Sequence, residues 1–272
     1  MKIINGRKIA KTLLTQVHEH IGRMSLTPGL AIVLVGDDPA SHLYVRIKER
    51  ACRQVGLKFE KKVFPATADE NEILRTIQQL NTRADIHGIV VQLPLPEQLN
   101  ENAIISAISP QKDVDGYHPE TIQRLVAGQQ TFIPALARSI LLLIESTGVP
   151  LGGKTVAVIA NSSEFYQPLE YLIRQRGGAS VFCAPTNFRE ACRNADIVIV
   201  AVGQPGIITA DDIKPNAVVI DVGITRQPEG VVGDVDATTL KNVPGFLTPV
   251  PGGVGPVTVA SLLANTVQAA EQ

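Results

Sequence analysis

The chain has 272 residues, of which 44% are hydrophobic and 19% charged, and its 25 basic residues nearly balance its 26 acidic ones. The resulting net charge of −1 provides no field that would attract nucleic acid or an anionic membrane. The first residues lack the apolar core of a signal peptide, and no apolar run approaches the roughly 18 residues of a membrane helix. We therefore expect a cytoplasmic protein with no nucleic-acid partner and no membrane contact.

Cysteine and histidine residues show no metal-binding pattern. The three cysteines, Cys52, Cys183 and Cys192, lack the C-x-x-C spacing of zinc ligands, and the five histidines do not cluster usefully along the chain. We expect free, partly buried thiols and no protein-bound transition metal.

The first half of the chain alternates predicted helices and strands. The expected elements are, in chain order, a helix over 7–23, a strand over 30–35, a helix containing 41–48 that stops near Gly56, a strand over 58–64, a helix from 69 to about 80, a strand over 87–96, and a short helix over 101–108. The strand over 87–96 is apolar on both faces, which is typical of a central strand in a parallel sheet.

The helix that follows the first buried strand carries Tyr44 and Lys48 four residues apart, so both lie on the same face. A phenol and an amine projecting together form a plausible reactive pair, but most exposed lysines have no chemical role. Both interpretations stay open at this point. The buried stripe of this helix is expected to contain Leu43, Val45, Ile47, Ala51 and Val55.

Polar residues follow the strand over 87–96. Gln92 lies at the carboxyl end of its apolar run, where it either satisfies a backbone group or points into a site, because ligands gather at that end of open α/β sheets. The loop Lys112-Asp-Val-Asp-Gly116 carries two carboxylates, Asp113 and Asp115. It is either a polar ligand clamp or an ordinary turn.

The second half repeats the alternation of strands and helices and predicts a doubly wound, Rossmann-like parallel sheet. The expected elements are an apolar helix around 140–144, a strand over 154–159, a helix over 165–176, a strand over 179–183, a short helix, strands over 196–203 and 216–223, a Pro/Gly loop over 248–256, and a helix over 258–270. We expect two α/β domains, 1–119 and 120–256, with the C-terminal helix 257–272 returning to the first.

Several short motifs occur in a fixed order along the chain. They are Ser41-x-x-Tyr-Val-x-x-Lys48, Val91-Gln-Leu-Pro-Leu95, Lys112-Asp-Val-Asp-Gly116, Ile213-Lys-Pro215, Val219-Ile-Asp-Val-Gly-Ile224, Gly233-Asp-Val-Asp236 and Pro251-Gly-Gly-Val-Gly-Pro-Val-Thr258. Together they resemble the methylenetetrahydrofolate dehydrogenase/cyclohydrolase family, the bifunctional FolD proteins. The similarity runs essentially from end to end.

This resemblance implies a two-step one-carbon reaction: 5,10-methylenetetrahydrofolate is oxidised with NADP to the methenyl cation, which water then converts to 10-formyltetrahydrofolate. It also implies a homodimer that binds tetrahydrofolate derivatives. By motif, the resemblance makes Lys48 the catalytic amine, places Tyr44 beside the folate, and pairs Gln92 with Lys48. The residues that it assigns to the folate cleft are Asp115, which holds the pterin, with Gly255 and Thr258.

The resemblance is weakest in the loop that follows the strand over 154–159. The family's Gly-Arg-Ser-x-x-Val-Gly-x-Pro is here Ala160-Asn-Ser-Ser-Glu-Phe-Tyr-Gln-Pro168. Glycines allow a backbone to approach a phosphate closely at a helix N-terminus, and the family's arginine supplies positive charge to the nucleotide phosphate. Here Glu164 adds a negative charge and Tyr166 adds an aromatic ring.

We assign Asn161, Ser162, Gly203 and Ile224 to the cofactor side and expect NADP binding to be weak or absent; an unusual but working NADP loop is the alternative that stays open. Two other segments also depart from the family, at Pro134-Ala-Leu-Ala-Arg-Ser139 and after the strand over 179–183. The alternatives are a cyclohydrolase-only enzyme or a folate-binding pseudoenzyme that has lost nucleotide binding. A dehydrogenase acting on another substrate is the least favoured.

Overall fold

The computed structural model describes residues 1–272, and they form two compact units. The three-stranded unit comprises Lys11–Ala135 and Val259–Gln272, and the six-stranded unit comprises Met1–Ala10 and Leu136–Thr258. No helix combines the length and the apolar character that crossing a membrane requires. These units divide the chain near 135 and 258, and they place the first ten residues with the second half. The functional partition at 119/120 and 256/257 stays a prediction.

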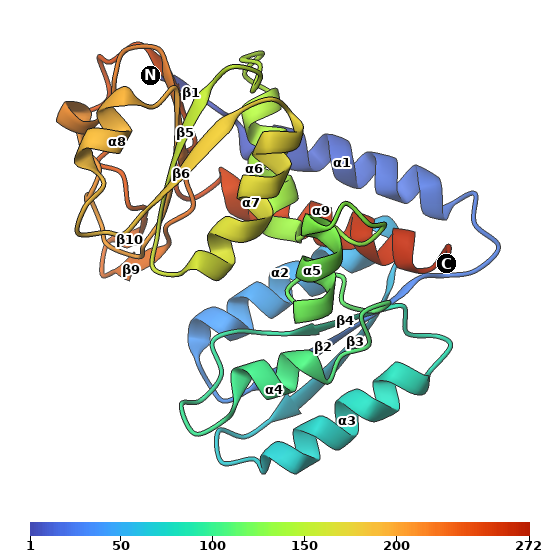
Figure 1. Ribbon diagram of the computed structural model, residues 1–272. Coiled ribbons are helices and arrows are strands. Elements are labelled where there is room, and N and C mark those ends of the chain that lie inside the picture. Colours follow the sequence, from blue (N-terminus) through green and yellow to red (C-terminus); the bar gives the residue numbers. More distant parts are fainter. The chain divides into compact units, whose positions relative to one another are not determined.

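The three-stranded unit contains a parallel sheet in the order β3-β2-β4 (Figure 1). Its strands are β2 (Gly29–Val35), β3 (Lys58–Phe64) and β4 (Gly88–Val91), and its helices are α2 (Pro39–Val55), α3 (Glu70–Thr82), α4 (Glu101–Ser106) and α5 (Pro119–Val126), with most of α1 (Gly6–Ile21) and α9 (Val254–Ala269). The expectation that the strand at 87–96 is central is wrong, because β2 is the strand with a partner on each side. β4 is nevertheless buried throughout, and Ile89 makes an isolated bridge to Asp113 on its other side.

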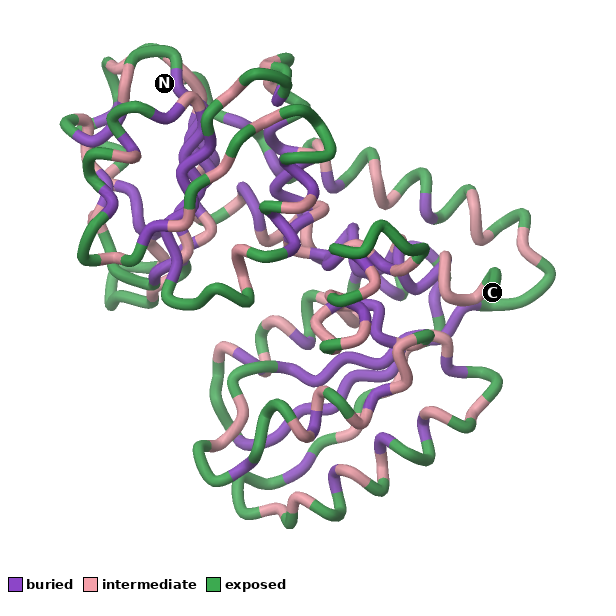
Figure 2. The backbone as a smooth tube through the Cα atoms, in the orientation of Figure 1, coloured by how far each residue is buried: buried purple, intermediate pink, exposed green.

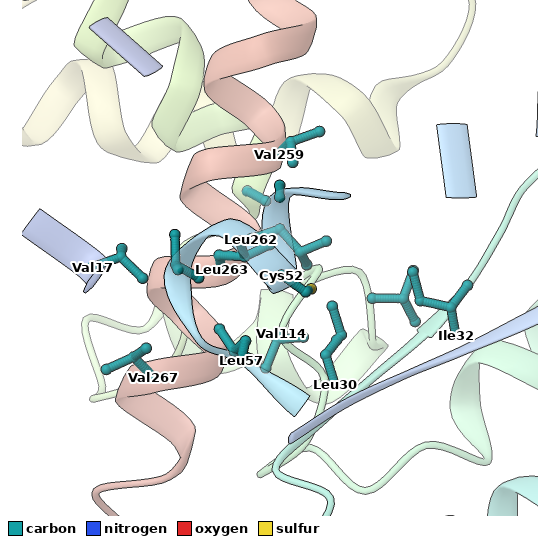
Figure 3. Close-up of a cluster of buried hydrophobic side chains, with 14 of the residues drawn as sticks. Val17, Leu30, Ile32, Cys52, Leu57, Val114, Val259, Leu262, Leu263 and Val267 are labelled. Atoms are coloured by element: carbon teal, nitrogen blue, oxygen red, sulfur yellow. The ribbon is translucent and has the colours of Figure 1, made fainter. Parts of the chain in front are cut away.

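Alternate residues of β2 enter two hydrophobic clusters, as the period of two of a strand requires. Leu30, Ile32 and Leu34 belong to one cluster, and Ala31 and Val33 belong to the other. Figure 2 shows the buried residues following the strands of this sheet. The first cluster, shown in Figure 3, also contains α9 side chains, namely Val259, Leu262, Leu263 and Val267. The predicted return of the C-terminal helix to the first half of the chain is therefore confirmed.

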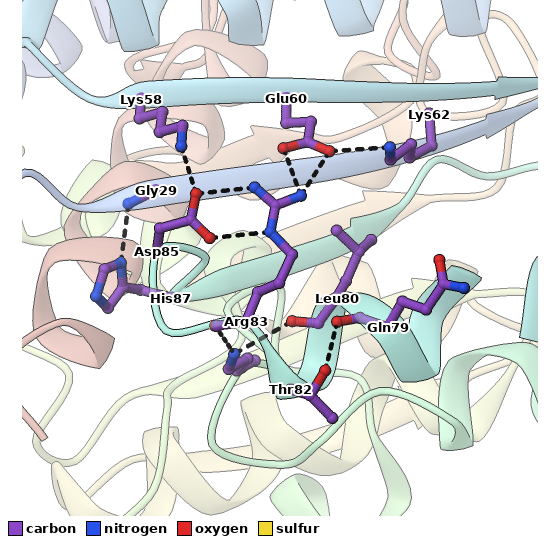
Figure 4. A network of polar contacts seen from close by, with 11 residues as sticks. Gly29, Lys58, Glu60, Lys62, Gln79, Leu80, Thr82, Arg83, Asp85 and His87 are labelled. Carbon is purple, nitrogen blue, oxygen red and sulfur yellow. Dashed lines mark hydrogen bonds and ion pairs between the residues drawn. The ribbon is translucent and has the colours of Figure 1, made fainter. Parts of the chain in front are cut away.

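The charged face of the edge strand β3 is held by a network of ion pairs (Figure 4). Arg83 contacts Glu60 at 2.8 Å and makes a two-point contact with Asp85, while Lys58 also binds Asp85 and Lys62 binds Glu60 at 3.0 Å. This network ties β3 to the segment between α3 and β4. Charged side chains also keep an exposed edge strand from pairing with another chain.

The buried stripe of α2 is rotated from the one expected. Leu43 and Ile47 are 39% and 42% exposed, whereas Ser41, Val45 and Cys52 are buried together with Ala51 and Val55. The helix is anchored at both ends, since the Asp38 carboxylate accepts a hydrogen bond from the Ser41 N–H and Gly56 adopts a left-handed conformation. This phase brings Lys48 next to the buried side of the helix.

The six-stranded unit contains a parallel sheet in the order β1-β11-β8-β7-β5-β6. Its strands are β1 (Lys2–Ile3), β5 (Thr155–Ala160), β6 (Ala179–Cys183), β7 (Ile197–Ala201), β8 (Ala217–Asp221) and β11 (Gly245–Leu247). Its helices are α6 (Ala135–Glu145), α7 (Ser163–Gln175) and α8 (Arg189–Asn194), with the turn η1 (Ala210–Asp212). An antiparallel hairpin consists of β9 (Thr225–Gln227) and β10 (Gly230–Val232). The chain runs outward from β5 to β6 and then back past β5 to β7 and β8. That reversal confirms the predicted doubly wound sheet.

The C-terminal helix begins earlier than expected, at Val254 rather than at 258. Pro256 lies in its first turn, where no helical partner is needed for the backbone N–H. The sequence also did not predict β1, β11 or α5, because their apolar runs are too short to show a period.

Candidate active site

Lys48 of α2 and Gln92 after β4 form the centre of a polar cluster in the three-stranded unit. The Lys48 Nζ donates a hydrogen bond to the Gln92 Oε1 at 3.0 Å, and the Gln92 Nε2 donates to the Leu93 carbonyl at 2.8 Å. The Gln92 amide therefore donates to a backbone carbonyl through its nitrogen and accepts from Lys48 through its oxygen. The first alternative, that Gln92 satisfies a backbone group, is confirmed, and the site role stays a prediction. Gln92 also holds the lysine in position without adding a second charge.

In the loop at 112–116, Lys112 and Asp113 make hydrogen bonds that hold the loop in place, whereas Asp115 takes no part in them. The Lys112 Nζ donates to the carbonyls of Leu80 and Arg83, at 3.2 and 2.7 Å, which anchors the loop to the end of α3. The buried Asp113 carboxylate accepts the N–H groups of Gly116 and His118 at 3.1 and 2.8 Å. The turn interpretation thus holds for Asp113, whose acceptor capacity is used within the loop.

Gly116 shows why this turn needs a glycine. Its φ is +86°, and an added Cβ would lie 2.6 Å from the Cα of Pro134. A side chain there would force the loop away from the segment that leads into α6. The neighbouring Asp115 is consequently presented from a rigid turn.

Lys48 and Asp115 influence each other electrostatically. Burial lowers the pKa of Lys48, and the negative charge of Asp115 partly opposes that shift. Burial raises the pKa of Asp115, while Lys48 acts in the opposite direction. Cys52, one turn along α2, has its pKa raised to about 12 by burial, so it stays a neutral thiol. The cluster therefore combines an amine that loses its proton more readily than usual with an adjacent carboxyl group.

The remaining folate-side residues have different surroundings. Tyr44 is partly exposed one turn before Lys48 on α2. Gly255 and Thr258 lie in the first turns of α9 and belong to the six-stranded unit. The Thr258 hydroxyl lies 2.9 Å from that of Ser139, and an added Cβ at Gly255 would meet no atom of the chain within 4 Å. Packing within the chain does not explain the glycine at this position.

The residues assigned to the cofactor lie along the carboxyl edge of the six-stranded sheet. The Asn161 Nδ2, after β5, donates to the Val202 carbonyl after β7 at 2.9 Å. The Gly203 carbonyl accepts the Thr225 hydroxyl at 3.3 Å, which places the segment containing Ile224 beside it. Ile224 itself is 45% exposed. The structure thus brings all four predicted residues to one edge, since Ser162 follows Asn161 at the end of β5 and precedes α7.

The two unusual side chains of the β5–α7 loop behave differently. The Tyr166 hydroxyl contacts the Ser180 carbonyl and hydroxyl at 3.1 Å, and its ring centroid lies 5.6 Å from that of Phe182 on β6. The ring is therefore directed toward the neighbouring strand and packed there. Glu164 is exposed, and hydrogen bonds from its own backbone N–H and from Ser162 lower its pKa. A negative charge does lie at the start of α7, as the sequence indicated.

Sequence reasoning assigned no role to two buried carboxylates, Asp221 and Asp234. The Asp234 Oδ2 accepts the N–H groups of Val202 and Gly203 at 2.6 and 3.0 Å. Asp221 accepts three backbone N–H groups, and burial with the nearby Asp234 raises its pKa to about 6. These residues hold the turns after β7 and β8. An aspartate at the end of an apolar strand was the available signal.

Each of the two α/β units is built on a parallel sheet. One contains a lysine–amide–carboxylate cluster and the other a doubly wound sheet, which is the architecture of a two-domain α/β enzyme. The sequence profile of the tetrahydrofolate dehydrogenase/cyclohydrolase catalytic domain matches residues 4–115, and that of the NAD(P)-binding domain of the same family matches residues 134–272. The bifunctional protein FolD of Geobacillus thermodenitrificans is 42% identical over 277 aligned residues, which cover 100% of this chain and 98% of the relative. The chain belongs to the tetrahydrofolate dehydrogenase/cyclohydrolase family.

Solved structures agree with this assignment. The bifunctional FolD methylenetetrahydrofolate dehydrogenase/cyclohydrolase of Campylobacter jejuni superposes with a TM-score of 0.95 at 34% identity, covering 100% of this chain and 99% of the other. The Trypanosoma brucei enzyme, solved with NADP cofactor and an inhibitor, gives 0.93 at 31% identity, with 99% and 97% covered.

The NAD(P)-binding profile includes the divergent loop. The expectation that nucleotide binding is weak or absent is therefore not borne out. The aromatic ring that Tyr166 adds to the loop packs on Phe182 of β6.

Proposed function

We propose that this protein oxidises 5,10-methylenetetrahydrofolate to 5,10-methenyltetrahydrofolate with NADP and then hydrolyses the product to 10-formyltetrahydrofolate. Family membership supports both steps, since relatives that align along the whole chain are named as bifunctional proteins. The observation that carries the proposal is the hydrogen bond between Lys48 and Gln92 beside Asp115.

The hydrolytic step requires a group that first accepts and then donates a proton. Water adds to the cationic methenyl carbon and loses a proton to the neutral Lys48 amine. The carbon–nitrogen bond to N5 then breaks, and N5 receives a proton as the formyl group remains on N10. Water is consumed and one net proton is released. A lysine whose pKa is lowered by burial accepts and returns a proton more readily than an exposed one, and Gln92 holds the amine without adding charge.

The folate is held by the residues around this amine. Asp115 is a suitable acceptor for the donor edge of a pterin, because it projects from a turn whose other carboxylate is already used. Tyr44 provides an aromatic face for packing. Family resemblance also assigns Gly255 and Thr258 to folate binding.

For the oxidative step, NADP supplies a hydride acceptor when it is bound. The carboxyl edge of β5, β7 and β8 fits a dinucleotide, because it lies at the reversal of strand order where such ligands bind in doubly wound sheets. Asn161 and Ser162 are at the first strand–helix turn, and Gly203, with a φ of +75°, lets the backbone approach closely. Ile224 offers an exposed apolar side chain. These residues would bind and orient the nucleotide.

We further propose that residues 1–119 with 257–272 form the folate-binding domain, that residues 120–256 form the nucleotide-binding domain, and that the protein is a homodimer. The catalytic-domain profile over 4–115 and the packing of α9 side chains in the cluster of the three-stranded unit support the first assignment. The NAD(P)-binding profile, which begins at 134, supports the second up to 256, although it extends to 272. Family resemblance supports the third, and light scattering of the purified protein tests it. Cytoplasmic location stays a prediction.

Two assays with the purified protein test the function. The first mixes 5,10-methylenetetrahydrofolate with NADP or NAD and follows reduced nucleotide. The second starts from methenyltetrahydrofolate and follows its loss. Activity in both assays is expected. Hydrolysis without any reduction of either nucleotide would restrict the protein to the cyclohydrolase step.

A further inference from the structure

A hollow of about 620 Å³ lies beside the carboxyl ends of β6 and β7 in the six-stranded unit. Its size falls within the range of small-molecule sites. It is polar, and residues from the β6–α8 segment and from the loop after β7 form its walls. The residues that matter to the argument are Thr186, Phe188, Arg189, Glu190, Arg193 and Gln204.

Arg189 is held in this hollow by two contacts. One terminal nitrogen donates to the Asp212 carboxylate at 2.5 Å, and the guanidinium lies 5.2 Å from the centre of the Phe188 ring. Asp212 is fully buried, whereas the Arg189 side chain is 56% exposed. A guanidinium has five N–H donors, so one contact with Asp212 leaves others facing solvent. The Arg189 side chain is thus held in place and still has N–H donors that a ligand can use.

Arg193 adds a second guanidinium one turn later on α8. Its Nε donates to the Asp211 carbonyl at 2.9 Å, a contact that consumes no positive charge. The walls contain one carboxylate, the exposed Glu190. With the buried Asp212 that pairs with Arg189, two guanidinium groups face two carboxylates, but each guanidinium keeps N–H donors that these contacts do not use. Such donors suit a ligand that presents planar groups of negatively charged oxygens.

The topology indicates which part of a dinucleotide reaches this hollow. β5 pairs with both β6 and β7 in parallel, so the carboxyl ends of all three strands meet at one edge. In such sheets the pyrophosphate lies at the first strand–helix turn, here β5–α7, and the adenosine ribose lies over the end of the next strand, here β6. A carboxylate at that strand end recognises the ribose hydroxyls of NAD, whereas an arginine nearby accommodates the 2′-phosphate of NADP. β6 ends at Cys183 and Ala184 follows it, so no carboxylate lies at this strand end.

We propose that Arg189 and Arg193 bind the 2′-phosphate of NADP and make this protein prefer NADP over NAD. The inference rests on the proposed oxidative function. It explains how the chain tolerates asparagine at 161, where the resembling family has an arginine: the positive charge comes from α8, across the same strand edge, rather than from the β5–α7 loop.

The test uses 2′,5′-ADP, which carries the adenosine and the 2′-phosphate without the nicotinamide. Titration calorimetry compares it with 5′-AMP for the natural protein, Arg189→Ala and Arg193→Ala. Arg189→Lys keeps a positive charge beside the buried Asp212 and serves if Arg189→Ala does not fold. The control is Arg174→Ala, an exposed arginine in the last turn of α7, outside the hollow. NADP and NAD are titrated in the same set.

Each alanine variant should weaken 2′,5′-ADP and NADP roughly ten- to a hundredfold, the effect of one lost charge-assisted hydrogen bond, and leave 5′-AMP and NAD nearly unchanged. Arg189→Lys should show a smaller loss, and Arg174→Ala none. If the natural protein binds NADP but Arg189→Lys and Arg193→Ala bind 2′,5′-ADP as it does, this inference is wrong and the proposed function stands. If the natural protein binds neither NADP nor 2′,5′-ADP, the NADP assignment fails as well.

Discussion

The polar cluster of the three-stranded unit and the β5–α7 loop of the six-stranded unit are built in opposite ways. Around Lys48, the Gln92 amide binds the lysine with its oxygen and a backbone carbonyl with its nitrogen, and burial changes the pKa values of Lys48 and Asp115. In the loop, the side chains are exposed or turned back onto the protein, as with Asn161 on Val202 and Tyr166 on Ser180. The first region would, on the proposed function, move protons, and the second would leave backbone groups available to a nucleotide.

The consequence of a substitution also differs between the two regions. A substitution in the Lys48 cluster would remove a partner from a buried group. The departures in the loop are compatible with the fold because the new side chains find neighbours there: Tyr166 packs on Phe182. Variants that attack each region in turn can break or sharpen this comparison.

The largest effect is expected for Lys48→Ala. Loss of the group that exchanges protons with water and N5 should reduce hydrolysis of methenyltetrahydrofolate by about 10²–10⁴-fold. The measurement is the hydrolysis rate at saturating folate, with circular dichroism to verify the fold. Lys61→Ala, which removes an exposed lysine on β3 of the same unit, is the matched control. Hydrolysis by Lys48→Ala at the natural rate would remove the lysine from the mechanism.

The next effect separates the two carboxylates of one loop. Asp115→Ala should weaken folate binding by about 1.5–3 kcal/mol, or roughly ten- to a hundredfold, through a lost charge-assisted hydrogen bond. Its thermal unfolding should remain close to that of the natural protein, since Asp115 is not the acceptor that closes the turn. Calorimetry with a folate ligand and a melting curve provide both values.

Asp113→Ala is the matched comparison for that experiment. It leaves the N–H groups of Gly116 and His118 without their acceptor, which should cost about 1–3 kcal/mol of folding free energy. Equal losses of stability in both variants would contradict the division between a structural and a ligand-binding carboxylate.

The sequence predicted most of the regular elements because long apolar runs and clear stop signals determine them. β3 matches its predicted bounds, and β2 and α2 end within about a residue of theirs. The phase of α2 was wrong, because Leu43 and Ile47 suggested an apolar stripe that the fold leaves largely exposed. Burial of Ser41 and Cys52 instead depends on tertiary packing, which spacing within one helix does not encode.

The site was predictable only where a motif carried it. The Lys48–Gln92 contact was anticipated from family resemblance, and the structure contains it. The supporting groups Asp234 and Asp221 were not assigned, because their backbone partners lie in turns distant in sequence. The roles of the site residues themselves stay predictions. The orientation of Tyr166 was missed because β6, which receives its ring, lies in a different part of the chain.

A smaller effect is expected for Tyr166→Ala. The change removes the ring from Phe182 and the hydroxyl from Ser180, so it should reduce the folding free energy by about 2 kcal/mol. NADP affinity should change little, because the ring does not face the loop. Tyr166→Phe is the control that keeps the ring and loses only the hydroxyl. A marked gain of NADP affinity in Tyr166→Ala would show that the ring does obstruct the nucleotide.

The smallest effect is a displacement of the pH profile of hydrolysis in Asp115→Asn. The neutral Lys48 amine accepts the proton of water, so the rate should rise with pH as the lysine loses its proton. The charge of Asp115 raises the pKa of Lys48 and thereby opposes the lowering by burial. Removing that charge should lower the lysine pKa further and move the rising limb to lower pH, measured as turnover at saturating folate. Cys52, with a pKa of about 12, does not titrate in this range. A limb that stays in place or moves to higher pH would show that Asp115 does not act on Lys48 through its charge.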